Sequence, residues 1–122
     1  MGVTIKMVTT KLDVLAALIE GGEYVRIVSD GTDYGIYQEF GHVTASGSHV
    51  PAHPFMVPAV EQVKPAFIGG ARQILEKMNL SPDRFVEEIA RHIETIAKNL
   101  APYKTGNLKN SITVSRKEDF LG

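Results

Sequence analysis

The sequence contains no cysteine and no tryptophan. The missing cysteine excludes disulfide bonds, thiolate metal sites and cysteine nucleophiles. Neither sign of charge is in clear excess, because 13 Lys and Arg residues are balanced by 14 Asp and Glu residues. Such a near-neutral chain lacks the basic field that non-specific nucleic-acid binding uses. No apolar run approaches the ~18 residues of a membrane span, and residues 1–6 lack a secretion signal's apolar core. We therefore expect a soluble protein without membrane contact that is used inside a cell or released when that cell lyses.

The length and composition fit one globular domain. A chain of 122 residues is the size of a single domain, which we expect to span residues 1–122. Hydrophobic residues make up 43% and charged residues 22%, a balance that excludes wholesale disorder. A domain this small has little stability to spare, so we also expect oligomerisation.

The first forty residues predict a mixture of strands and helix. Apolar and polar residues alternate over residues 3–8, which is typical of a half-buried strand. Apolar residues at helical spacing over 12–19 predict a helix that Gly21 and Gly22 end. Residues 23–28 are rich in β-branched and aromatic side chains and predict a second strand. Residues 34–40 fit either one helical turn or a third strand.

The middle of the chain is rich in proline and glycine. Residues 42–53 hold mostly small and polar side chains, and we expect a flexible loop there. A helical pattern follows over residues 59–78, with Pro58 in its first turn. Pro65 lies inside this pattern and should kink the helix, because proline cannot donate to the carbonyl four residues back.

The last forty residues give the clearest helix prediction. Ser81 is a suitable N-cap, and an apolar stripe runs along residues 82–100. A helical turn near residues 108–111 and a strand over 112–114 should follow, and residues 116–122 should form a frayed tail. The predicted fold class is α+β, with a small antiparallel sheet packed against two or three helices.

Histidines near one glutamate raise the question of a metal or catalytic site. His49 and His53 are four residues apart, but the intervening Pro51 opposes the helical geometry in which they would share a metal. Glu39 and His42 could act as an acid–base pair. We favour solvated loop histidines and predict no catalytic residue, metal or cofactor. The alternative is a small metal-binding or hydrolytic domain that uses Glu39, His42, His49 and His53.

A weakly basic segment gives a second alternative. Four cations lie near the end of the sequence, namely Lys104, Lys109, Arg116 and Lys117. A nucleic-acid-binding or toxin-like α+β module could use them. Because Glu118 and Asp119 offset this charge, we favour a solvated surface.

Phe55 stands on a segment framed by Pro54 and Pro58. Such an aromatic anchor could dock onto a partner, or it could fill the core of its own domain. The sequence leaves both interpretations open.

Three segments together resemble one family. They are residues 34–41 (YGIYQEFG), 51–59 (PAHPFMVPA) and 101–112 (APYKTGNLKNSI). On these blocks, the chain resembles the tail-completion and head–tail connector, or neck, proteins of long-tailed phages. In that family the Thr-Gly-x-Leu block comes first, whereas here it comes last, so the chain looks circularly permuted. Permutation is tolerated where the old termini lay close together.

The resemblance implies a structural role without catalysis. Copies would form a ring at the head–tail junction of the virion, after assembly in the host cytoplasm. Partners would be other copies, the head connector, and the tail-terminator or tail-tube proteins, with DNA only as passing cargo. Contacts to partners would involve His42, Val43, Ser48, His49, Val50, Pro54 and Phe55.

The same resemblance assigns a structural role to the motif residues. Tyr34, Tyr37 and Phe40 would pack the sheet against the helices, while Leu108 and Ile112 would point inward. The complete set of motif positions is Tyr34, Tyr37, Glu39, Phe40, Gly41, Pro58, Pro102, Thr105, Gly106, Leu108, Ser111 and Ile112.

Overall fold

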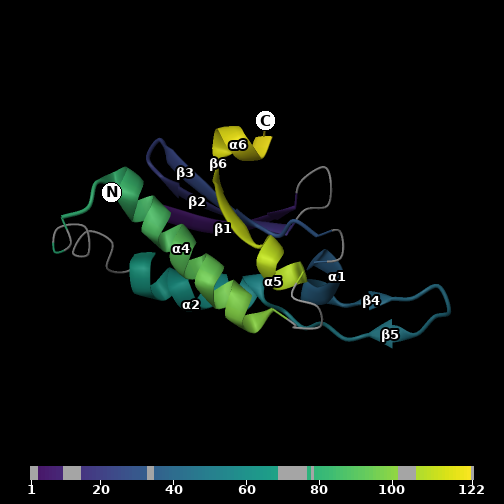
Figure 1. The fold of residues 1–122 in the computed structure, drawn as a ribbon. Coiled ribbons are helices and arrows are strands. Elements are labelled where there is room, and N and C mark those ends of the chain that lie inside the picture. The colour runs from purple at the N-terminus through teal and green to yellow at the C-terminus, as the bar shows by residue number, and fades with distance from the viewer. Residues whose placement is uncertain are drawn as a thin grey trace.

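The fold is a four-stranded antiparallel sheet covered on one face by two helices (Figure 1). The computed structural model describes residues 3–9, 15–32, 35–68, 77, 79–101 and 107–121. The sheet order is β1-β2-β3-β6, where the strands are β1 (Val3–Thr9), β2 (Leu15–Gly21), β3 (Tyr24–Ser29) and β6 (Thr113–Arg116). The covering helices are α2 (Met56–Ile68) and α4 (Pro82–Leu100). The predicted α+β class is confirmed.

The remaining elements are short. A separate two-stranded hairpin consists of β4 (His42–Val43) and β5 (His49–Val50). Three small helices complete the description, namely α1 (Gly35–Phe40), α5 (Asn107–Ser111) and α6 (Lys117–Leu121). Within the described part of the chain, no helix has the length and apolar character to cross a membrane.

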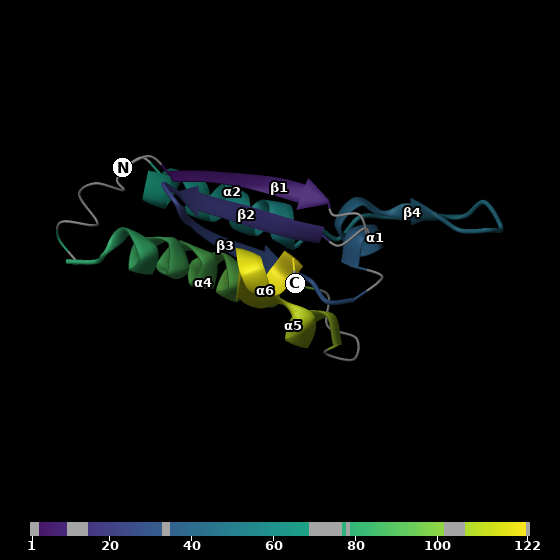
Figure 2. The ribbon, with the colours of Figure 1, turned by 90° about the horizontal axis from the view of Figure 1, so that it is seen from above.

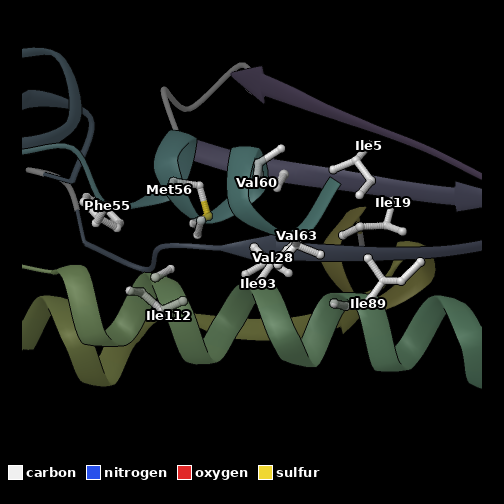
Figure 3. Packing of buried hydrophobic residues seen from close by; sticks show 14 of the residues in the cluster. Ile5, Ile19, Val28, Phe55, Met56, Val60, Val63, Ile89, Ile93 and Ile112 are labelled. Carbon is white, nitrogen blue, oxygen red and sulfur yellow. The ribbon is translucent and has the colours of Figure 1, made fainter. Parts of the chain in front are cut away.

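The core lies between the sheet and the two covering helices (Figure 3). Strand β1 contributes Val3 and Ile5, which confirms the period-2 prediction for this segment. Ile19 lies opposite Ile5 in the register and shares the inward face. From α4, Ile89 and Ile93 complete the contact with no exposed surface. At roughly 1.5–3 kcal/mol for each large aliphatic side chain buried, this layer supplies most of the driving force for folding.

Helix α4 begins and runs as the sequence predicts. The Ser81 hydroxyl accepts a hydrogen bond from the Arg84 backbone N–H at 3.3 Å, Pro82 occupies the first turn, and Asp83 adds an acid there. Six residues of the predicted stripe are buried, namely Phe85, Val86, Ile89, Ala90, Ile93 and Ala97.

The predicted helix over residues 12–19 is wrong where the structure describes it. Residues 15–21 form β2, a central strand paired with β1 and β3. Residues 15–19 of this strand are five consecutive apolar residues, so the sequence lacks the alternation of a half-buried strand. Helical spacing can be found in any such run.

Two further predictions are wrong. The predicted flexible loop contains the β4–β5 hairpin, in which the Thr44 N–H donates to the Ser48 carbonyl at 2.9 Å. The predicted frayed tail contains the last residue of β6 and helix α6 instead. Arg116 pairs with Arg26 on β3, so the sheet fixes the start of this segment.

Helix α2 starts two residues before Pro58 and continues through Pro65 to Ile68. Residues 69–76 and 78 of the predicted helical pattern lie outside the described residues. Short helix α5 and strand β6 confirm the predicted turn and strand near residues 108–114.

Candidate functional site

The β4–β5 hairpin projects from one end of the molecule, and α1 lies at its base (Figure 2). In the sequence, α1 precedes the hairpin and α2 follows it. The first two motif blocks therefore lie on either side of the hairpin. This region is the candidate functional site.

Glu39 holds the two sides of the hairpin together. Its side chain is 2% exposed. Carboxylate Oε1 accepts hydrogen bonds from the backbone N–H groups of Phe55 at 3.2 Å and Met56 at 2.7 Å, and Oε2 accepts one from Val57 at 3.2 Å. These donors are orphan groups of the first turn of α2, where a negative charge is also favourable. Both carboxylate oxygens of Glu39 thus bond to the start of α2 and fix it against α1.

Gly41 shapes the exit from α1 into the hairpin. Its φ of +73° lies in the left-handed region. A Cβ at this position would lie 2.8 Å from the Val50 carbonyl oxygen and 3.0 Å from the Ala52 nitrogen. Both atoms belong to the returning backbone, so only glycine allows the two sides to approach this closely. The His53 N–H donates to the Gln38 carbonyl at 2.7 Å and closes the base.

Apolar side chains are exposed around this base. Tyr37 is 52% exposed, Phe40 60% and Val43 57%. The predicted role of Tyr37 and Phe40 in packing the sheet is therefore wrong. Helix α1 buries Gly35 and Glu39, which are four residues apart and lie on one side of the helix. The aromatic residues Tyr37 and Phe40 lie off this side and therefore point outward. An open groove of about 610 Å³ lies beside them, lined by Phe40, Gly41, His42, Val43, His49, Val50, Pro51 and Ala52.

The third motif block meets the end of β3 next to α1. The Ser111 hydroxyl lies 2.9 Å from Asp30 Oδ1, and the Gly31 N–H donates to the Ser111 carbonyl at 3.2 Å. Asp30 is 1% exposed and also accepts hydrogen bonds from the N–H and hydroxyl of Thr32. A Cβ on Gly35 would collide with the Asp30 carboxylate. Asp30 therefore joins β3, α1 and α5, a role that the sequence analysis missed because one aspartate in a turn carries no distinctive pattern.

A second missed residue links β3 to α4. Arg26 is 5% exposed and donates to Glu87 and Asp83 of α4, each at 2.7 Å. Burial alone would lower the pKa of the Arg26 guanidinium, but its hydrogen bonds and charge attraction to Asp83 and Glu87 outweigh burial and raise the pKa. Arg26 is thus a permanently charged link between β3 and α4.

Phe55 belongs to the core. Its side chain has no exposed surface, so it cannot serve as the predicted contact residue without unpacking the domain. The other predicted contact residues do reach the surface: Val43, Ser48, His49 and Pro54 are exposed, and His42 and Val50 are half-buried. Leu108 and Ile112 are buried, as predicted. Tyr34, Pro102, Thr105 and Gly106 lie outside the described residues.

The histidines do not form a cluster. In the hairpin register His42 pairs with Val50 and His49 pairs with Val43. Adjacent strand residues point to opposite faces, so His42 and His49 face away from each other. Across the described residues, no three His, Asp or Glu side chains lie close enough to hold a metal ion. This geometry does not support the alternative of a metal-binding site.

The basic alternative gains little from the structure. Arg116 and Lys117 are exposed and lie next to the acidic first turn of α6 with Glu118 and Asp119. Lys109 is half-buried on α5, and Lys104 is not among the described residues.

Comparison with protein-family models, curated proteins and solved structures finds no match to the chain.

Proposed function

We propose that this chain is a structural virion-assembly protein of a tailed phage or prophage. It acts at the head–tail junction as an oligomeric ring that joins the head connector to the tail, without catalysis or cofactor. Its partners are other copies, the head connector, and the tail-terminator or tail-tube proteins, and DNA passes through as cargo. It assembles in the host cytoplasm and ends in the virion.

The observation that carries this proposal is the hydrogen bonding of Glu39. This residue of the Glu-Phe-Gly block caps the helix that begins in the Pro-Phe block, through the backbone N–H groups of Phe55, Met56 and Val57. Ser111 of the third block packs on Asp30, just before the first block. Segments far apart in sequence thus form one unit at the base of the hairpin. This supports reading them as one motif set.

The strand register also accommodates the permuted order of the blocks. Val3 at the start of β1 pairs with Gly21, Gly21 pairs with Tyr24, and Arg116 at the end of β6 pairs with Arg26. The start of β1 and the end of β6 therefore lie at the same end of the sheet. Three strand spacings separate them, or about 14 Å. A short connection could span this distance, as permutation of the family's order requires.

Deletion of the gene from the phage or prophage that encodes it tests the proposal. Negative-stain images of the induced lysate should show filled heads and tails that are not joined, and a plasmid copy of the chain should restore whole particles. The purified chain should also form rings, seen by light scattering and imaging. Intact particles from the deletion strain would overturn the proposal.

A further inference from the structure

We infer that the β4–β5 hairpin is an assembly arm that adds to the open edge of β1 in a second copy of this chain. The inference rests on the proposed ring, since it names the contact that would close it. Three features support it: the base of the hairpin is fixed, the hairpin carries no charged residues, and the outer edge of β1 is open.

The arm is fixed at its base. Gly41 brings its two sides into close contact, and the His53–Gln38 backbone hydrogen bond closes them. Glu39 anchors the returning side to α2. A hairpin held in this way has a set direction, so it can present its strand edges to a neighbour without a large loss of conformational entropy.

The arm is unsupported beyond its base. A two-stranded hairpin alone is at best marginally stable in water, and this one projects away from the body of the domain (Figure 1). Free strand edges are usually protected by charge. Residues 42–53 contain no Lys, Arg, Asp or Glu, while Val43 is 57% exposed. The arm therefore has the composition of a segment that a protein partner covers.

Strand β1 offers the matching edge. It lies at the margin of the sheet, and no strand of the described residues pairs with its outer side. Its seven residues contain no proline and give about 23 Å of backbone donors and acceptors. The opposite margin, β6, has only four residues. Strand addition to an open edge is a common mode of recognition.

The arm reaches a different molecule. Figure 2 shows the hairpin extending past the tip of β1, in the direction in which β1 points. It therefore cannot fold back on the outer edge of its own β1. Contact between the arm of one copy and the β1 edge of the next is heterologous, and repetition around an axis closes a ring.

The size of the arm fits a protein partner of this kind. Every residue of 36–54 except Glu39 is exposed or half-buried, which makes 18 surface residues. A stable interface takes about 20–30 residues from each partner. A neighbour that covers both the arm and the exposed side of α1 would come close to this size, whereas contact with the two short strands alone would not.

Cysteine cross-linking tests the inference directly, because the chain has no cysteine of its own. The double variant Thr4→Cys/Ser48→Cys places one thiol on β1 and one on the arm, both at exposed positions. The purified variant, treated with a short bismaleimide at high protein concentration, should give a ladder of covalent oligomers beyond the dimer. Each single variant can give at most dimers.

The matched control moves one thiol to the exposed face of α4. Thr95→Cys/Ser48→Cys should give no ladder, since α4 packs mainly against β3 and β2, away from the β1 edge. Val43→Lys added to the test pair should abolish the ladder, whereas Thr95→Lys should not. No ladder from the test pair, or an equal ladder from the control pair, overturns the inference.

The experiments distinguish failure of the head–tail role from failure of the arm contact. If the deletion strain makes unjoined heads and tails but the test pair gives no ladder, the arm contact is wrong and the head–tail role stands. If the ladder forms but the deletion strain makes intact particles, the head–tail role is wrong and the arm contact stands.

Discussion

The Glu39 carboxylate accepts a 2.7 Å hydrogen bond from the backbone N–H of Met56, seventeen residues later in the chain. Everything between these two residues is the hairpin and its base. A single buried side chain therefore fixes both where α2 begins and where the hairpin leaves the domain. Its contribution can be measured separately from that of the exposed surface.

Substitution of Glu39 should destabilise the whole domain. Glu39→Ala leaves three backbone donors, in two buried hydrogen bonds and one partly buried, without an acceptor, and we expect the free energy of unfolding to fall by about 2–4 kcal/mol. Glu39→Gln should lose less, because the amide oxygen still serves one or two donors. Urea denaturation at neutral pH measures the loss. Glu61→Gln on the exposed side of α2 is the control and should change stability by less than about 0.5 kcal/mol. Equal effects of Glu39→Gln and Glu61→Gln would contradict the capping role.

Gly41 and Gly47 form a matched pair. Both have positive φ, at 73° and 88°, but only a Cβ on Gly41 would meet backbone atoms. Gly47→Ala should cost about 1–2 kcal/mol from backbone strain. Gly41→Ala should cost at least about 1 kcal/mol more and should shift the amide NMR signals of residues 49–53. Similar unfolding free energies for the two variants would show that the close approach at Gly41 is not tight.

Asp30 and Ser111 should be energetically coupled. A double-mutant cycle with Asp30→Ala and Ser111→Ala should give a coupling of about 1–2 kcal/mol, because their side chains share a partly buried hydrogen bond. The same cycle with Ser111→Ala and Thr95→Ala should be additive, since Thr95 lies on the exposed face of α4. If the changes in unfolding free energy of Asp30→Ala and Ser111→Ala are additive, Asp30 does not link α5 to β3.

Arg26 should stabilise the domain by a constant amount over a wide pH range. Arg26→Met removes one cationic partner from Asp83 and leaves Glu87 with Arg91 alone. We expect a loss of about 2 kcal/mol, below that of a fully buried pair, because both acids keep some contact with water. The folded-state pKa of Arg26 is raised, so its contribution is complete below the unfolded pKa and is lost only above the folded one. Denaturation should thus give the same deficit from about pH 6 to about pH 10. Arg84→Met, at an exposed ion pair on α4, is the control.

Phe55 and Phe40 separate folding from assembly. Phe55→Ala should destabilise the domain by about 3–5 kcal/mol, because a fully buried ring is lost from the core. Phe40→Ala should leave the unfolding transition within about 0.5 kcal/mol and should weaken oligomers measured by light scattering. Assembly that is unaffected by Phe40→Ala would exclude the exposed side of α1 from the interface.

Elements with a distinctive local pattern could be predicted from the sequence. Helix α4 combines an N-cap, an N-terminal proline and a long apolar stripe, and the structure confirms all three. Strand β2 could not be predicted, because five consecutive apolar residues, 15–19, remove the alternation on which a strand prediction depends. Strand β6 was predicted, but its last residue, Arg116, and helix α6 were not, since the pairing of Arg116 with Arg26 depends on a strand far away in the sequence.

The site was predictable in outline only. Proline, glycine and small residues set residues 42–53 apart from the neighbouring elements but predicted a flexible loop there, whereas the structure has the β4–β5 hairpin. The sequence did not show that Glu39 is buried while Tyr37 and Phe40 are exposed. That difference depends on which side of α1 faces the start of α2, and six residues are too few to establish a helical period. Arg26 and Asp30 act through partners 57 and 81 positions away, and no local pattern reveals such pairs.

The pairing of β3 with β6 has a consequence for the time at which the chain can fold. Strand β3 is made early, but the strand that covers its edge begins only at Thr113, more than 80 residues later. At a synthesis rate of roughly 5–20 residues per second, that edge stays unpaired for about 4–17 s on every ribosome. During this interval β3, with its apolar Ile27 and Val28, can pair with the wrong strand. Production of this protein should therefore be sensitive to growth temperature and to chaperones that bind nascent chains.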